Sequence, residues 1–288
     1  MIIGVHHIGI MVAKRSHAPW LEHICTFGAD GWCVGPNIHL KLEVSHNPIV
    51  KPTLSRPVNM PGIAHICLQS CDIDEGLARG LQAGLVPLSE PVDLGTPFRY
   101  LYAHTEDGIL LELEGAPFVR DADPRYWIGH IAFVARDIEP LVGFYARALG
   151  LKASTVLRLQ ANARVDKVAG LKDVDLSAMW LPGLNLGLEF WQYHNPVPAP
   201  DLTQASTGLQ YLCFECTDFE ADCAHVVSQG GVPDTQNHLE LTACKSAAFK
   251  DPEGNRFRLI AFDDADDPMA IKNLPHRDIL AQVSSELI

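Results

Sequence analysis

The sequence predicts an α+β protein built from four copies of one strand–helix–strand unit. Four segments begin alike, each with a short apolar strand: residues 4–12, 62–70, 128–136 and 208–216. A second strand closes every copy, and the last three copies place a helical pattern between the two. We expect the apolar strand face of each unit to pack on that unit's own helix, which leaves the opposite, concave face to polar residues.

The opening strands share one polar position within an apolar, alternating pattern. In GVHHIGIMV, GIAHICLQS, IGHIAFVAR and GLQYLCFEC the residues at that position are His7, His65, His130 and Tyr211. Alternation of this kind is typical of a strand with one buried face.

Helices are predicted after the last three opening strands. Asp72, Asp137 and Asp218 each precede an apolar residue and then a second acid. That order is typical of a helix N-cap followed by an acidic first turn. The patterns GLARGLQAGL, PLVGFYARALGL and ADCAHVVSQGG follow, and the last two end at glycine, a common helix terminator.

The closing strands also share one position. In residues 37–45, 108–115, 184–192 and 255–262 the matching residues are Glu43, Glu112, Glu189 and Arg258. The alignment is supported by spacing, because His65 and Glu112 are 47 residues apart, as are Tyr211 and Arg258.

The repeat is also nested, since the segments after the first and third units resemble each other. We therefore expect two halves of two units each, with a boundary in the stretch APFVRDADPRY. The predicted division is 1–118 for the first pair, 119–267 for the second pair and 268–288 for a C-terminal tail.

Strand alternation places the shared His and Glu on the face opposite the apolar residues. A carboxylate in a partly enclosed site is costly unless it is paired, hydrogen-bonded or bound to a metal. Two facing units would bring together two imidazoles and two carboxylates, a set that suits one Zn²⁺, Ni²⁺, Mn²⁺, Co²⁺ or Fe²⁺ per chain. Pairing of the first and second units is the default, whereas pairing of the second and third gives another complete set. Both sets contain His65 and Glu112.

Four short motifs resemble the vicinal oxygen chelate superfamily, which contains glyoxalases, bleomycin-resistance proteins and extradiol dioxygenases. They are His-Ile-Gly-Ile at 7–10, His-Ile-Cys-Leu at 65–68, Leu-Leu-Glu-Leu at 110–113 and Asp-Pro-Glu-Gly-Asn at 251–255. The resemblance implies four βαβββ units, paired into two cup-shaped, partly open barrels with the metal in the cup.

The resemblance also implies a ligand set. In the first two units a quartet like that of glyoxalase I or methylmalonyl-CoA epimerase would consist of His7, Glu43, His65 and Glu112. The second half offers His130 and Glu189, but Tyr211 and Arg258 occupy the other two positions. Ring-cleaving dioxygenases place two His and one Glu in their second half, so this sequence departs from their pattern.

The resulting prediction is a metal-dependent lyase or isomerase that acts on a small substrate chelated through vicinal oxygens. Glu112 or Glu43 would move the substrate's α-proton. One alternative is an Fe²⁺ extradiol dioxygenase, and another is a resistance-type protein that binds a small molecule. The second half could supply an apolar pocket from Trp180, Phe190, Trp191 and Tyr193.

Charge and composition argue against some classes of binding partner. The formal net charge of −13 argues against nucleic acid and anionic membrane surfaces. No apolar run reaches the length of a membrane span, and the N-terminus is interpreted as a strand rather than a signal peptide. The scattered cysteines are expected to be thiols of a reduced, cytoplasmic protein. A homodimer is left open.

Overall fold

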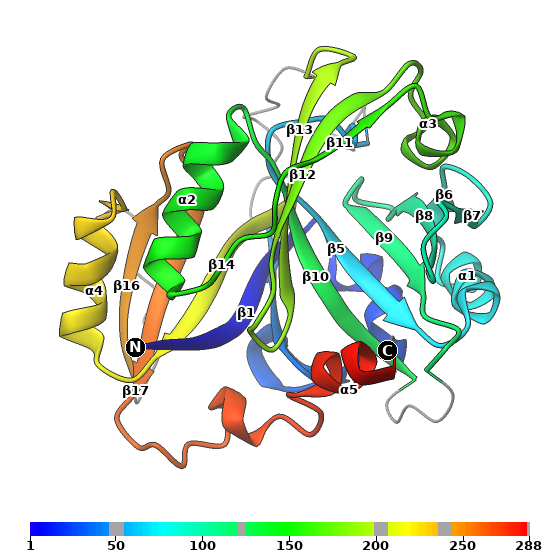
Figure 1. Ribbon diagram of the computed structural model, residues 1–288. Helices are drawn as coiled ribbons and strands as arrows, with labels where there is room; N and C mark the ends of the chain where they lie inside the picture. The colour runs from blue at the N-terminus through cyan, green and yellow to red at the C-terminus, as the bar shows by residue number, and fades with distance from the viewer. Residues whose placement is uncertain (46–54, 120–124, 199–206, 236–243, 287–288) are drawn as a thin grey trace.

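The computed structural model describes residues 1–45, 55–119, 125–198, 207–235 and 244–286 (Figure 1). The middle of the predicted boundary, residues 120–124, lies outside them. The four predicted units are present, and each opens and closes with a strand at the predicted place. The second unit contains β5 (Gly62–Ser70), α1 (Ile73–Gln82), β6 (Val86–Pro87), β7 (Val92–Asp93), β8 (Arg99–His104) and β9 (Leu110–Gly115).

The third and fourth units follow the same plan. The third contains β10 (Tyr126–Val134), α2 (Ile138–Leu149), β11 (Leu157–Gln160), α3 (Ala163–Ala169), β12 (Asp175–Leu181) and β13 (Gly187–Asn195). The fourth contains β14 (Gly208–Cys216), α4 (Phe219–Ser228), β15 (Val232–Pro233), β16 (Cys244–Lys250) and β17 (Arg256–Phe262).

The first unit is abbreviated. It consists of β1 (Ile2–Val12), η1 (Arg15–His17), η2 (Pro19–His23), β2 (Thr26–Phe27), η3 (Ala29–Gly31), β3 (Trp32–Val34) and β4 (His39–Val44). Short 3-10 helices therefore stand where the other units have an α-helix, which accounts for the 36 residues between His7 and Glu43.

All three predicted aspartates stand at the N-cap of their helix, but only two of them cap it with the side chain, because Asp137 at the start of α2 makes no such hydrogen bond. The side chain of Asp72 accepts hydrogen bonds from two backbone N–H groups of the first turn of α1. Asp218 does the same for one N–H of α4. Helix α2 ends at Gly150, whose φ of 66° is left-handed and favours glycine.

The strands form two sheets. Sheet A has the order β15-β16-β17-β14-β1-β4-β3-β2, and sheet B has the order β11-β12-β13-β10-β5-β9-β8-β6. Sheet A therefore joins the first unit to the fourth, and sheet B joins the second to the third. This corrects the default pairing, and the sheets do not coincide with segments 1–118 and 119–267. Every unit presents the same kind of opening strand, so sequence periodicity alone does not determine which edges meet.

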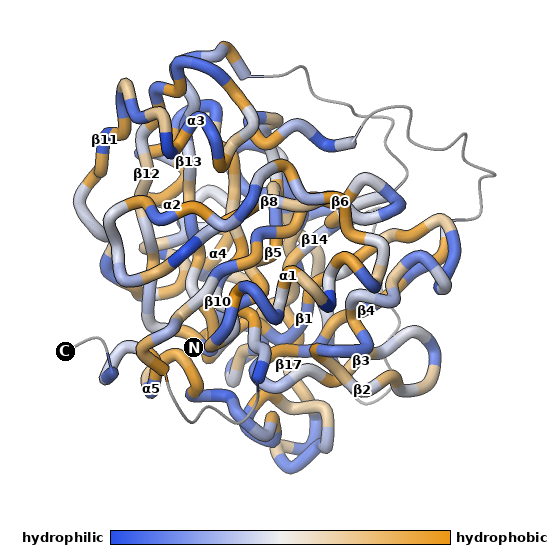
Figure 2. The backbone as a smooth tube through the Cα atoms, turned by 90° about the vertical axis from the view of Figure 1, so that its right-hand side faces the viewer, coloured by the Kyte–Doolittle hydropathy of each residue, from blue (hydrophilic) through white to orange (hydrophobic). Residues whose placement is uncertain are grey.

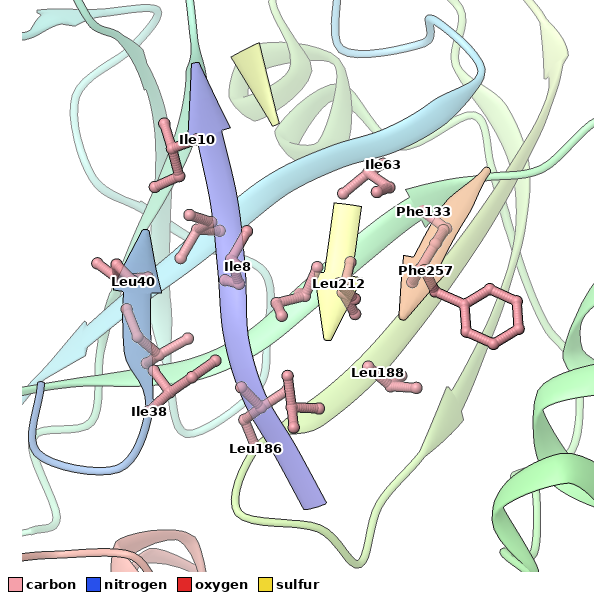
Figure 3. Packing of buried hydrophobic residues seen from close by; sticks show 14 of the residues in the cluster. Ile8, Ile10, Ile38, Leu40, Ile63, Phe133, Leu186, Leu188, Leu212 and Phe257 are labelled. Carbon is pink, nitrogen blue, oxygen red and sulfur yellow. The ribbon is translucent and has the colours of Figure 1, made fainter. Parts of the chain in front are cut away.

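The apolar faces of the two sheets pack against each other. Ile8 and Leu40 of sheet A belong to the same buried cluster as Ile63, Phe133 and Leu188 of sheet B (Figure 3). In Figure 2, hydrophobic residues recur along the strands, whereas hydrophilic stretches gather in peripheral loops. The predicted α+β fold of paired βαβββ units is confirmed, and over the described residues the sheets stay open rather than closing into barrels.

The tail packs back onto both sheets. It contains η4 (Ile271–Asn273) and α5 (Ile279–Glu286). Ile279 and Val283 of α5 bury themselves against Trp127 of β10. Among the described helices, none has the length and apolarity needed to cross a membrane.

Candidate metal centre

Four neighbouring strands of sheet B carry the candidate ligands. His65 lies on β5, Glu112 on β9, His130 on β10 and Glu189 on β13. The register brings them level, because Ala132 of β10 pairs with His65 across one edge and with Glu189 across the other. On the far side, β5 and β9 pair in parallel with Cys67 opposite Glu112. All four side chains point to the face of sheet B that is turned away from the core.

The four side chains converge on one point. His130 Nε2 lies 2.8 Å from Glu112 Oε2 and 3.1 Å from Glu189 Oε2. His65 Nε2 lies 3.3 Å from Glu112 Oε2 and 3.8 Å from Glu189 Oε2. One ligand atom from each residue can be chosen so that all four lie within 4.8 Å of one another.

The chemistry of this cluster fits a divalent cation. His65 is 2% exposed, and both glutamates are also buried. Within the described chain, Glu112 Oε2 and Glu189 Oε2 have no correctly oriented hydrogen-bond donor, despite the nearby imidazoles. Buried carboxylate oxygens without a donor are costly, and a bound cation would satisfy both. Burial alone would raise the pKa of Glu112, but the neighbouring imidazoles of His130 and His65 lower it to about 2.

A second group of side chains surrounds the cluster. Trp180 Nε1 donates to Glu189 Oε1 over 2.7 Å and so orients that carboxylate. The Cys67 thiol donates to Glu114 Oε2 over 3.2 Å, and burial raises the pKa of Glu114 to about 7. Cys67 and Glu114 could also form a ligand group with Glu112 and His130. Burial raises the pKa of the Cys67 thiol, however, which favours the protonated thiol that donates to Glu114 over the thiolate that would bind a metal.

A cavity of about 350 Å³ opens beside the cluster. Glu112, His130 and Glu189 form part of its floor. Aromatic walls surround them: Tyr100, Tyr102, Trp180, Trp191 and Tyr193.

Three of the four aromatic residues suggested for a pocket therefore do line one. Trp180, Trp191 and Tyr193 line the cavity, but Phe190 does not. Phe190 points to the opposite face of β13 and stacks on Phe133 in the core, as strand alternation requires.

Sequence reasoning missed one helix that lines this cavity. Helix α3 forms part of the cavity wall and contributes Val165, Val168 and Ala169. The signals were local: the Asn162 side chain accepts from two backbone N–H groups of α3, and Gly170 ends the helix with a φ of 63°. In the described parts of the other units no helix stands at the matching place, so the repeat gave no reason to expect one there.

The structure does not bring His7 and Glu43 to His65 and Glu112. They lie in sheet A, beside Tyr211 and Arg258 of the fourth unit. Tyr211 donates to Glu43 Oε1 over 3.2 Å, and the Arg258 guanidinium stacks 4.3 Å from the centre of the Tyr211 ring. The predicted quartet is therefore divided between two sheets. The residues that converge are those of the alternative pairing, in which the second unit joins the third: His65, Glu112, His130 and Glu189.

Comparison with known families agrees with this fold. A model described as "Glyoxalase/Bleomycin resistance protein/Dioxygenase superfamily" matches residues 127–259, from β10 to β17. This region belongs to that superfamily. The resemblance found in the sequence is thereby confirmed, although no curated protein matches the chain.

Several solved structures share the arrangement over nearly the whole chain. Glyoxalase I from Zea mays is 15% identical with a TM-score of 0.64, covering 98% of this chain and 96% of that one. A mutant of that enzyme is 16% identical with a TM-score of 0.65, covering 94% of this chain and 96% of that one. A putative dioxygenase from Bacillus subtilis is 10% identical with a TM-score of 0.55, covering 100% and 97%. At these identities the likeness concerns the fold.

Proposed function

We propose that the chain is a divalent-metal-dependent lyase or isomerase that acts on a small substrate through two adjacent oxygens. The observation that carries this proposal is the convergence of two buried imidazoles and two buried carboxylates beside a largely apolar, aromatic-lined cavity. The superfamily includes metal-dependent enzymes, and the likeness of fold to glyoxalase I supports the same class here.

The metal would be held by His65, Glu112, His130 and Glu189. When bound, it supplies a Lewis acid that polarises the substrate oxygens. The mixed nitrogen and oxygen ligands suit Zn²⁺, Ni²⁺, Mn²⁺, Co²⁺ or Fe²⁺ alike.

Glu112 is our candidate for proton transfer. Trp180 fixes the second oxygen of Glu189, whereas none of the described side chains donates to Glu112 with hydrogen-bond geometry. Glu112 also faces the cavity, where a substrate carbon would lie. A carboxylate in this position can accept a proton from the substrate and return it to a neighbouring atom. Glu43, the other residue predicted for this role, lies in sheet A, away from these ligands, and is not proposed here.

The cavity indicates what kind of substrate it holds. Its walls are mostly apolar and aromatic, and three carboxylates lie in it: Glu112, Glu114 and Glu189. Neither lysine nor arginine is present among its described lining residues. We therefore expect a substrate with an apolar body and no anionic group apart from its metal-binding oxygens. The apolar wall formed by α3 would limit the water around the reacting atoms.

Substitution of the ligands tests the proposal. His65→Ala and Glu112→Ala should each lose metal, by elemental analysis after dialysis, and should lose turnover while keeping the circular dichroism spectrum. Glu43→Gln, in the other cup, is the matched control and should retain full metal occupancy. Full occupancy in both His65→Ala and Glu112→Ala would overturn the assignment.

An Fe²⁺ ring-cleaving dioxygenase is the second candidate. Two histidines and one carboxylate of the same cluster are enough for Fe²⁺, and the aromatic walls suit a catechol ring. Oxygen uptake with Fe²⁺ and a catechol distinguishes the two. Turnover that needs O₂ and disappears when Zn²⁺, Ni²⁺, Mn²⁺ or Co²⁺ replaces Fe²⁺ would favour the dioxygenase, whereas anaerobic turnover would favour the lyase or isomerase.

A further inference from the structure

Sheet A has a cavity of its own, separate from the metal centre. Its volume is about 120 Å³, and the polar side chains around it are Glu43, Gln210, Tyr211, Asp234, Arg256 and Arg258. Glu43, Tyr211 and Arg258 occupy the positions that correspond to metal ligands in sheet B. This second cup has therefore kept its shape while its chemistry has changed.

Arg258 is the unusual group in this cavity. It is only 7% exposed, and its Nη1 atom is buried with no hydrogen-bond partner among the described residues. In the same part of the chain, no carboxylate oxygen lies within 4.0 Å of its guanidinium. The guanidinium lies against the face of the Tyr211 ring. A buried guanidinium without a direct ion-pair partner is costly, and a bound anion would reduce that cost.

The other charges around the cavity already have partners. Asp234 lies 3.5 Å from Arg256 Nε and 4.0 Å from Lys250 Nζ. Glu43 accepts the hydroxyl of Tyr211. Arg258 is therefore the cation in this cavity that is available to an anionic ligand. A metal ion is excluded, because a guanidinium has no lone pair to offer and repels cations.

We propose that the cup of sheet A binds a small monocarboxylate that carries a hydroxyl group. The carboxylate would take the planar donor edge of Arg258, which matches it in geometry. The hydroxyl would donate to Glu43, which accepts only one hydrogen bond from a described side chain, that of Tyr211. A dianion such as phosphate would be repelled by Glu43 and Asp234, and the volume limits the ligand to a few non-hydrogen atoms. This inference does not depend on the reaction proposed for sheet B.

Calorimetric titration of the full chain with glycolate, and with acetate for comparison, tests the proposal. Glycolate should bind the wild type in the millimolar range or tighter, and Arg258→Met should weaken binding by about tenfold or more. Arg258→Lys should retain part of it. Because small carboxylates can also bind a metal, His130→Gln is the control for the other site and should bind glycolate as the wild type does.

Glu43→Gln tests recognition of the ligand's hydroxyl group separately from recognition of its carboxylate. It also provides a test if Arg258→Met does not fold. It should bind acetate at least as well as the wild type, because a repulsive charge is gone, while the preference for glycolate over acetate shrinks. Three results would each overturn the inference: no binding to the wild type at millimolar concentration, unchanged binding in both Arg258 variants, or loss of binding in His130→Gln.

Discussion

Two buried histidines should make the fold sensitive to mild acid. The Nε2 atoms of His6 and His39 lie 2.8 and 2.9 Å from the same carbonyl oxygen, that of Met269. A carbonyl only accepts, so both rings donate from Nε2 and together hold the tail on sheet A. The two rings are 1% and 2% exposed and are packed among His7, Trp32 and Phe262.

The size of the effect follows from the pKa values. Burial, together with the neighbouring charge of His39, lowers the pKa of His6 to about 3, and burial lowers that of His39 to about 4. In the unfolded chain both titrate near 6.5. Below that pH the unfolded chain binds more protons than the folded one, so stability falls as pH falls towards the folded values. From pH 6.5 to pH 5 each histidine costs roughly 2 kcal/mol, or about 4 kcal/mol for the pair.

Urea unfolding at pH 7 and at pH 5 measures this loss. His39→Gln keeps a donor for the Met269 carbonyl but removes one titrating ring, so its loss between the two pH values should be about 2 kcal/mol smaller than that of the wild type. His225→Gln, on the exposed surface, controls for removal of any histidine. Equal losses in the wild type and His39→Gln would refute the reasoning.

Three further predictions concern the metal. Trp180→Phe removes the donor that orients Glu189 and should weaken metal binding about 10- to 100-fold in a chelator competition, whereas Trp191→Phe, whose indole nitrogen has no described partner, should not. Removal of the metal with a chelator should lower the thermal midpoint of the wild type, because a ligand at a free concentration of 100 times its Kd stabilises the fold by about 2.7 kcal/mol. The midpoint of His130→Ala should not change, because that variant has lost a metal ligand. Elemental analysis should give about one metal per chain, since Arg258 excludes a cation from sheet A; a value near two would contradict this.

Much of this architecture could be predicted because it depends on residues that are close together in the sequence. Alternation along β5 and β9 assigned His65 and Glu112 to the polar face, and the aspartate caps located α1 and α4. The pairing of units could not be predicted in the same way. It depends on which opening strand meets which, a contact between β1 and β14 that joins residues about 200 positions apart in the chain. His65 and Glu112 were predicted under either pairing, whereas His7 and Glu43 depended on the default one.

The observed pairing has a consequence for how the two cups can differ. Each cup takes both of its opening and both of its closing strands from one sheet, and the packed core of Ile8, Leu40, Phe133 and Leu188 lies between the sheets. Tyr211 and Arg258 therefore alter only the site that contains His7 and Glu43. Under pairing of neighbours, they would instead have faced His130 and Glu189 and left those two residues without a complete set. The same substitutions thus leave one complete ligand quartet in either arrangement, but they place it on different residues, and only the strand order of the fold decides which.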